Sequence, residues 1–155
     1  MKNFKPSDFR KEIDLNKIIL NEAPNAENVP MDVLFVGAGP AGLAGAIELK
    51  RLVKKDNEAG GNLAIEVGVL EKAESLGEHC LSGAVVNPRS LRELFPDLKD
   101  SDFPFKKKVD SERVYMLTES GSIRLPTPPT MHNQGNYVTS ICELVKWLGT
   151  KAEEL

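Results

Sequence analysis

The residues best suited to chemistry in this sequence form a glycine-rich turn and a single carboxylate. The turn is Gly37-Ala38-Gly39-Pro40-Ala41-Gly42, with the spacing G-x-G-x-x-G. In this motif the first glycine permits a sharp turn, the second lets a pyrophosphate lie against the backbone, and the third lets a helix approach a strand closely. Glu71 ends a later apolar run, where a carboxylate can accept hydrogen bonds from an adenosine ribose. The two features predict a dinucleotide site, and the carboxylate disfavours the 2′-phosphate of NADP.

That chemistry depends on the elements around the motif. Residues 31–36 predict a first strand, and residues 40–55 predict a helix whose first turn tolerates Pro40. The start of such a helix offers free N–H groups and a positive dipole end to phosphates. Residues 63–70 predict a second strand that Glu71 follows directly. Two strands joined by a helix predict a right-handed β-α-β unit with a parallel strand pair.

The N-terminal residues do not have the pattern of a core element. Residues 1–30 predict an extension, in which residues 21–30 form a linker rich in Pro and Asn. A short amphipathic helical turn is expected before the linker, at Ile13, Ile18, Ile19 and Leu20. Residues 31–155 are then expected to form one partial FAD/NAD(P)-binding domain.

Smaller elements are predicted after the second strand. They are a small-residue loop at 76–84, a short helix at 90–95 started by Asn87-Pro88, an irregular segment at 96–104, a β-hairpin at 113–125 with Gly121 in its turn, and a final helix after Ser140. Ser140-x-x-Glu143 has the pattern of a capping box. One parallel pair and one hairpin leave sheet edges uncovered, so the domain is expected to be incomplete.

Composition narrows the class of protein. Of 155 residues, 41% are hydrophobic and 28% are charged, which is typical of a globular protein, and the net charge of −3 does not favour nucleic-acid binding. The run Lys106-Lys107-Lys108 is followed by acids and predicts a solvated loop. No apolar run has the length of a transmembrane helix. The N-terminus lacks the apolar core of a secretory signal, and its acids argue against a mitochondrial transit peptide.

Cysteine and histidine give no metal or nucleophile pattern. Cys80 and Cys142 are far apart and show no C-x-x-C, so they predict neither a disulfide framework nor a zinc site. Reduced thiols in a cytosol-facing protein are expected. His79 and His132 lack a second ligand at a suitable spacing and are interpreted as structural residues.

Several segments occur together in a combination more specific than the glycine motif. They are Val-Gly-Ala-Gly-Pro-Ala-Gly-Leu (36–43), Glu-Lys-Ala (71–73), Leu-Ser-Gly-Ala (81–84), Glu-Leu-Phe-Pro (93–96), Gly-Asn-Tyr (135–137) and Leu-Val-x-Trp (144–147). In this order they resemble the N-terminal part of the electron-transfer flavoprotein–ubiquinone oxidoreductase family. The resemblance covers about Asp32 to Leu155.

The resemblance implies a fold and an activity. The fold is α/β, an incomplete Rossmann-like FAD-binding domain of the glutathione-reductase type with a small β-hairpin insertion. The activity is oxidoreduction: electrons pass from electron-transfer flavoprotein, through FAD, to ubiquinone at a membrane surface. The implied location is monotopic, on the inner face of the bacterial cytoplasmic membrane or on the mitochondrial inner membrane. A [4Fe–4S] cluster and a quinone pocket belong to later parts of the family's longer chain, and a cluster needs four thiolates where this chain has two cysteines.

The resemblance also implies roles for particular residues. In the glycine turn (Gly37, Ala38, Gly39, Pro40, Ala41 and Gly42) the glycines carry the FAD pyrophosphate, while Glu71, beside Lys72, binds the adenosine ribose. Ser82 and Gly83 match a loop expected to run along the cofactor. No catalytic side chain is predicted, because in flavin electron transfer the cofactor carries the reaction.

The family's segment that corresponds to residues 76–97 belongs to a membrane-contacting region. Its apolar residues here are Leu81, Val85, Val86, Leu91, Leu94 and Phe95. Contact with a membrane interface and ordinary core packing both explain them.

Other functions suit the same motif. A nicotinamide-dependent dehydrogenase or another flavoprotein reductase also uses G-x-G-x-x-G with an acid at the end of a strand. A non-catalytic dinucleotide-binding or interaction module is a third hypothesis. This fragment is expected to be inactive alone as a ubiquinone reductase.

Overall fold

The computed structural model describes residues 12, 14–18 and 29–155, and the chain divides into two units, Met1–Pro30 and Met31–Leu155. In the first unit, α1 (Leu15–Ile18) is a single turn of helix, and the backbone N–H of Asn16 donates to Asp14 Oδ1 at 3.1 Å. Ile18 of the predicted helical turn lies in α1. The other three residues of that prediction, Ile13, Ile19 and Leu20, lie outside the described residues, as does most of the predicted linker.

The second unit begins with the predicted β-α-β arrangement. It consists of β1 (Val33–Val36), α2 (Pro40–Glu58) and β2 (Val67–Leu70). The two strands are parallel, with Val33 opposite Val67 and Val36 opposite Leu70. The helix lies so close to β1 that a Cβ at Gly45 would be 2.7 Å from the Phe35 ring. The prediction of a mixed α/β fold with a parallel β-α-β start is confirmed.

Three bounds of this β-α-β arrangement differ from expectation. β1 starts at Val33 instead of residue 31. β2 starts at Val67 instead of residue 63, because side chains bind the backbone of Leu63 and the N–H of Glu66. Of the described backbone groups at residues 63–66, only the Glu66 carbonyl bonds to the β1 segment, accepting from Asp32 N and Val33 N. The Asn57 side chain binds both backbone groups of Leu63 at 2.7 and 2.8 Å, and Asp32 Oδ2 accepts from Glu66 N at 2.8 Å. α2 continues three residues beyond the expected residue 55, to Glu58.

A second sheet was not predicted from the sequence. It has the order β3-β7-β4, with β3 (Gly83–Val86) and β4 (Phe105–Lys108) both antiparallel to β7 (Tyr137–Ser140). The loop prediction is therefore wrong for Gly83 and Ala84. It is also wrong for the lysine run, which forms most of β4 with its side chains exposed. β4 is an edge strand, where lysines discourage further strand pairing, so the strand carries no apolar alternation that would reveal it.

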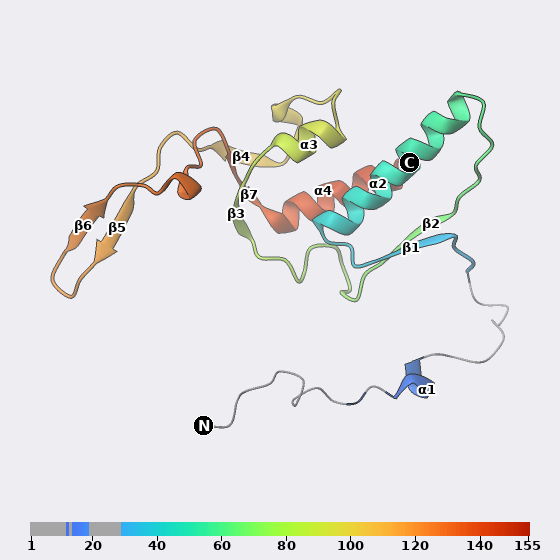
Figure 1. Ribbon diagram of the computed structural model, residues 1–155, viewed down its shortest axis with the longest axis horizontal. Coiled ribbons are helices and arrows are strands. Elements are labelled where there is room, and N and C mark those ends of the chain that lie inside the picture. The colour runs from blue at the N-terminus through green and yellow to red at the C-terminus, as the bar shows by residue number, and fades with distance from the viewer. Residues whose placement is uncertain (1–11, 13, 19–28) are drawn as a thin grey trace. The chain divides into compact units, whose positions relative to one another are not determined.

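The core lies among the helices α2, α3 (Arg89–Leu94) and α4 (Ile141–Glu153), and Phe105 of β4 packs against it. Figure 1 shows α2 beside α4, and these helices contact each other. The buried apolar side chains come from α2, α4, α3 and the segments beside them: Ala38, Leu43, Ile47, Leu91, Phe95, Phe103, Leu144, Val145 and Leu148. Trp147 packs against this cluster, with its ring centroid 5.0 Å from that of Phe95.

Of the two hydrogen bonds of the predicted capping box at the start of α4, the structure has the one that the Ser140 side chain accepts. Ser140 Oγ accepts from Glu143 N at 3.4 Å, as predicted. The Glu143 carboxylate pairs with Lys106 on β4. Leu155 lies beyond the end of α4 and is 48% exposed.

The predicted hairpin is present as β5 (Val114–Leu117) and β6 (Ser122–Leu125). Its turn is closed by a hydrogen bond from Thr118 N to Gly121 O at 2.9 Å. In Figure 1 the hairpin extends away from α2 and α4. Two short 3-10 turns, Asp100–Asp102 and Pro129–Met131, complete the described elements of this unit.

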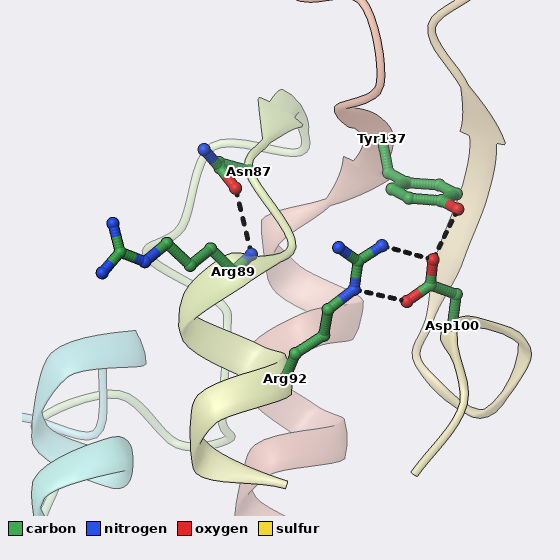
Figure 2. Close-up of polar contacts among 5 residues, drawn as sticks. All are labelled: Asn87, Arg89, Arg92, Asp100 and Tyr137. Carbon is green, nitrogen blue, oxygen red and sulfur yellow. Dashed lines mark hydrogen bonds and ion pairs between the residues drawn. The ribbon is translucent and has the colours of Figure 1, made fainter. Parts of the chain in front are cut away.

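A polar cluster joins α3 to the 3-10 turn Asp100–Asp102 and to β7 (Figure 2). Arg92 on α3 donates from Nε and Nη2 to the two oxygens of Asp100, at 2.8 and 2.6 Å, and Tyr137 on β7 donates to Asp100 Oδ2 at 2.8 Å. These bonds, the Arg92 bonds first, lower the pKa of Asp100 from its ordinary value of 3.8 to about 2. Asn87 Oδ1 accepts from Arg89 N at 3.0 Å just before the same helix, whose N-cap position is Pro88 instead of the predicted Asn87.

The substitution Asp100→Asn should lower the free energy of unfolding near neutral pH by about 1 kcal/mol, a modest figure because the carboxylate is partly exposed. The lowered pKa means that the stabilising contribution is fully present above pH 3.8 and is lost as the pH falls from 3.8 towards about 2. The difference in Tm between wild type and variant should therefore shrink across that interval. Thermal unfolding followed by circular dichroism at a series of pH values measures this.

Asp97→Asn is the control for the pH series. Asp97 is exposed, and its side chain makes no hydrogen bond within the part of the chain that the structure describes. If both variants show the same pH profile, the cluster around Asp100 does not stabilise the fold.

Candidate functional site

The glycine turn connects β1 to α2 in a conformation that needs its first glycine. Gly37 has φ +104°, in the left-handed region that side chains disfavour, and its N–H donates to Leu70 O at 2.7 Å. The chain then enters α2, with Gly39 as N-cap and Pro40 in the first turn. A Cβ at Gly37 or Gly39 would meet nothing within 4 Å, so the space beside the backbone is open.

The third glycine of the motif is required for packing. A Cβ at Gly42 would lie 2.0 Å from the carbonyl oxygen of Gly37. Only glycine lets the first turn of α2 approach the preceding turn this closely. The motif therefore has open backbone at its first two glycines and a tight contact at its third.

Glu71 lies directly beside this turn. Its Oε2 accepts from Ala38 N at 2.9 Å, and its Oε1 accepts from Ala73 N at 2.9 Å. These N–H groups, that of Ala73 first and then that of Ala38, lower the pKa of Glu71 and keep its carboxylate ionised at neutral pH. The carboxylate thus links the end of β2 to the turn that follows β1. An ionised carboxylate retains lone pairs for further hydrogen-bond donors, such as hydroxyl groups.

A cleft of about 450 Å³ opens where these groups meet, within the size range of ligand pockets. The residues along it are Val36, Gly37, Ala38, Gly39, Leu70, Glu71, Lys72, Ala73, Gly77, Glu78, His79 and Cys80. Of the predicted site residues, it brings together Gly37, Ala38, Gly39, Glu71 and Lys72.

The other predicted site residues do not line this cleft. Pro40, Ala41 and Gly42 lie in the first turn of α2. Ser82 and Gly83 are used at the start of α4, where Ser82 O accepts from Ile141 N at 3.0 Å and Gly83 pairs with Ser140. Ser82 and Gly83 were expected to run along the cofactor, and neither of them lines this cleft.

Sequence reasoning missed the wall made by Gly77, Glu78, His79 and Cys80. The sequence signal for this wall is the small-residue loop at 76–84, which another backbone or a ligand can approach closely. Gly77 has φ +84°, and a Cβ there would lie 2.8 Å from Cys142 O. The loop therefore lies against α4 and can form one side of the cleft.

Two further observations concern metal-ligand groups and membrane-spanning helices. Among the described residues, no group of three or more His, Cys, Asp and Glu side chains is arranged to hold a metal ion. In the same part of the chain, the helices are all too short or too polar to cross a bilayer. Of the apolar residues proposed to contact a membrane, Leu91 and Phe95 are buried in the core, whereas Leu81 and Val85 are exposed.

Gly42→Ala should destabilise the fold by about 1–3 kcal/mol, since the added methyl group would force the turn and the helix apart. Gly39→Ala is the matched control, because its Cβ enters open space at an ordinary φ of −74°. Thermal unfolding should show a lower Tm for Gly42→Ala and nearly wild-type stability for Gly39→Ala. Equal Tm values for the two variants would contradict the close approach at Gly42.

Comparisons with known proteins agree with the segments singled out above. No protein-family model matches the chain. The chain is 47% identical over 134 residues to the mitochondrial electron transfer flavoprotein-ubiquinone oxidoreductase of Dictyostelium discoideum, an alignment covering 86% of this chain and 21% of the relative. It is 45% identical over 133 residues to the electron transfer flavoprotein-ubiquinone oxidoreductase of Pseudomonas aeruginosa, covering 83% of this chain and 23% of the relative.

The relatives come from both eukaryotes and bacteria. A probable electron transfer flavoprotein-ubiquinone oxidoreductase of Acinetobacter baylyi is 44% identical over 133 residues. The chain spans a little over a fifth of the length of the curated relatives it matches. Over most of its own length, the chain is homologous to electron transfer flavoprotein-ubiquinone oxidoreductase.

Proposed function

We propose that residues 31–155 are the FAD-binding part of an oxidoreductase that passes electrons from electron-transfer flavoprotein to ubiquinone. The observation that carries the proposal is the contact between Glu71 and the Ala38 amide, because it places a strand-end carboxylate beside a glycine turn. This pairing of groups suits the ribose and the pyrophosphate of one adenine dinucleotide. The homology to electron transfer flavoprotein-ubiquinone oxidoreductase supports FAD as that dinucleotide.

The residues present fit this cofactor. The pyrophosphate needs close backbone approach, and the open space beside Gly37 and Gly39 allows it. The first-turn amides of α2, which lack intrahelical partners, would donate to the phosphates, and Pro40 removes no needed donor there. Glu71 would accept from ribose hydroxyls while Ala38 and Ala73 hold its orientation. Bound FAD supplies the electron-transfer chemistry, so the role of these residues is to bind and orient it.

The domain would be completed by chain outside residues 31–155. The β1-β2 sheet has only two strands, and Leu34, Val36 and Leu70 in it are 52, 80 and 55% exposed. Parallel sheets are normally buried on both faces. The relatives are four to five times longer than the matched segment, so they have enough further chain to cover such a sheet. We infer an incomplete Rossmann-like domain of the glutathione-reductase type, with residues 1–30 as an extension.

The remaining parts of the proposed activity depend on the longer protein. A [4Fe–4S] cluster and a quinone pocket are implied by the family resemblance, and two cysteines cannot supply the four thiolates of a cluster. Electron-transfer flavoprotein and ubiquinone, as donor and acceptor, are taken from the names of the relatives. The exposed Leu81 and Val85 are the residues in the described segment that suit contact with a membrane surface.

Titration of the chain with FAD, followed by flavin fluorescence and equilibrium dialysis, tests the proposal. FAD and ADP should bind, because they share the pyrophosphate and adenosine ribose, and NADP should bind least. Glu71→Gln should weaken the binding of FAD and of ADP by at least about tenfold, because the charged acceptor of the ribose hydroxyl groups is lost. Gly39→Ala should weaken them similarly without lowering Tm.

Glu48→Gln is the control, because Glu48 is exposed on α2 and does not line the cleft. Binding of NAD without binding of FAD would favour the nicotinamide-dependent hypothesis. A folded chain that binds no adenine dinucleotide, or that binds one equally well after Glu71→Gln, would rule out the proposed site.

A further inference from the structure

The two cysteines, which are 62 positions apart in sequence, meet in the fold. Cys142 Sγ lies 3.1 Å from the backbone oxygen of Cys80. A carbonyl oxygen is about 2.4 Å from the Cα of its own residue, so the Cys142 sulfur is within about 5.5 Å of the Cys80 Cα. A disulfide places its two Cα atoms about 4.4–6.8 Å apart and its sulfurs about 2 Å apart, so the sulfurs must still approach each other for the bond to form. Both cysteines are free in the structure, and both are half-buried.

The backbone around the two thiols is held in place from both sides. Ile141 N donates to Ser82 O at 3.0 Å, and Cys80 N donates to Gly77 O at 3.0 Å. Gly77 lies against the Cys142 backbone, since a Cβ there would be 2.8 Å from Cys142 O and 3.1 Å from Cys142 Cα. The loop 77–82 and the first turn of α4 are therefore in contact at Gly77, Cys80 and Ser82. These contacts keep the two cysteines in adjacent segments.

We propose that Cys80 and Cys142 are a reversible redox pair. Their disulfide would link the cleft wall formed by residues 77–80 to the start of α4. Gly77 and Cys80 both line the cleft, so a bond from Cys80 to Cys142 restrains that wall. Disulfides in reducing compartments are usually transient and regulatory. The pair is a modification site that is independent of whether the cleft holds FAD.

The oxidant is a low-molecular-weight disulfide such as oxidised glutathione. One cysteine thiolate attacks it, forms a mixed disulfide and releases one glutathione thiolate. The other cysteine then attacks the protein sulfur of that mixed disulfide and releases the second glutathione thiolate. The two cysteines lose two electrons and two protons, and the oxidised glutathione becomes two molecules of reduced glutathione.

The test is oxidation of the full reduced chain in a glutathione redox buffer, followed by acid quenching. Thiol titration should fall from two free thiols to none, and a non-reducing peptide digest should contain Cys80 linked to Cys142. The equilibrium constant for this disulfide should be at least about tenfold larger for the folded chain than for the chain in guanidinium chloride, because the fold brings the thiols together. The oxidised chain should melt about 10 °C higher than the reduced chain.

Cys80→Ser and Cys142→Ser are matched controls. Each should stop at a stable mixed disulfide with glutathione, because no second thiol is present to displace it. Wild-type protein that also accumulates glutathione on both cysteines, or that forms only disulfides between chains, would overturn the proposal. So would an equilibrium constant that is the same with and without denaturant.

Discussion

The described fold depends on one junction, where the end of β2, the glycine turn and the start of α2 meet. Glu71 receives the Ala38 amide at 2.9 Å, Gly37 donates to Leu70, and Gly42 lies directly against the Gly37 carbonyl. A side chain at Gly42 would separate the helix from the turn. The same contacts leave the backbone of Gly37 and Gly39 open. The junction that brings the helix close to the turn therefore also leaves the backbone of Gly37 and Gly39 accessible to a ligand.

The second half of the chain supports this junction from the other side of α2. The start of α4 is held by β7 and by the loop 77–82, and its apolar face packs in the core that also buries Leu43 and Ile47 of α2. α4 therefore connects the β3-β7-β4 sheet to the β-α-β unit. The loop between β2 and β3 has the cleft on one side and α4 on the other, and Gly77 both lines the cleft and contacts the start of α4.

Side chains of the second unit are well buried around α2 and α4 and much more exposed in β1 and β2. Val36 and Leu70 are largely exposed on a sheet of two strands, whereas Leu148 and Val145 of α4 are almost completely buried. A parallel pair cannot bury both its faces alone.

Local chemistry and spacing determined the β-α-β start, the strand-end position of Glu71, the β5-β6 hairpin and the Ser140 cap. Each depends on residues close in sequence, or on a motif whose backbone requirements are carried by its own glycines. Tertiary structure alone decided the β3-β7-β4 sheet, the Asp100 cluster and the meeting of Cys80 with Cys142. Those contacts join segments separated by tens of residues, and short edge strands such as the lysine-rich β4 carry no periodic pattern. The packing of α2 against α4 determines which distant segments come into contact. The local spacing of residues in the sequence carries no information about that packing.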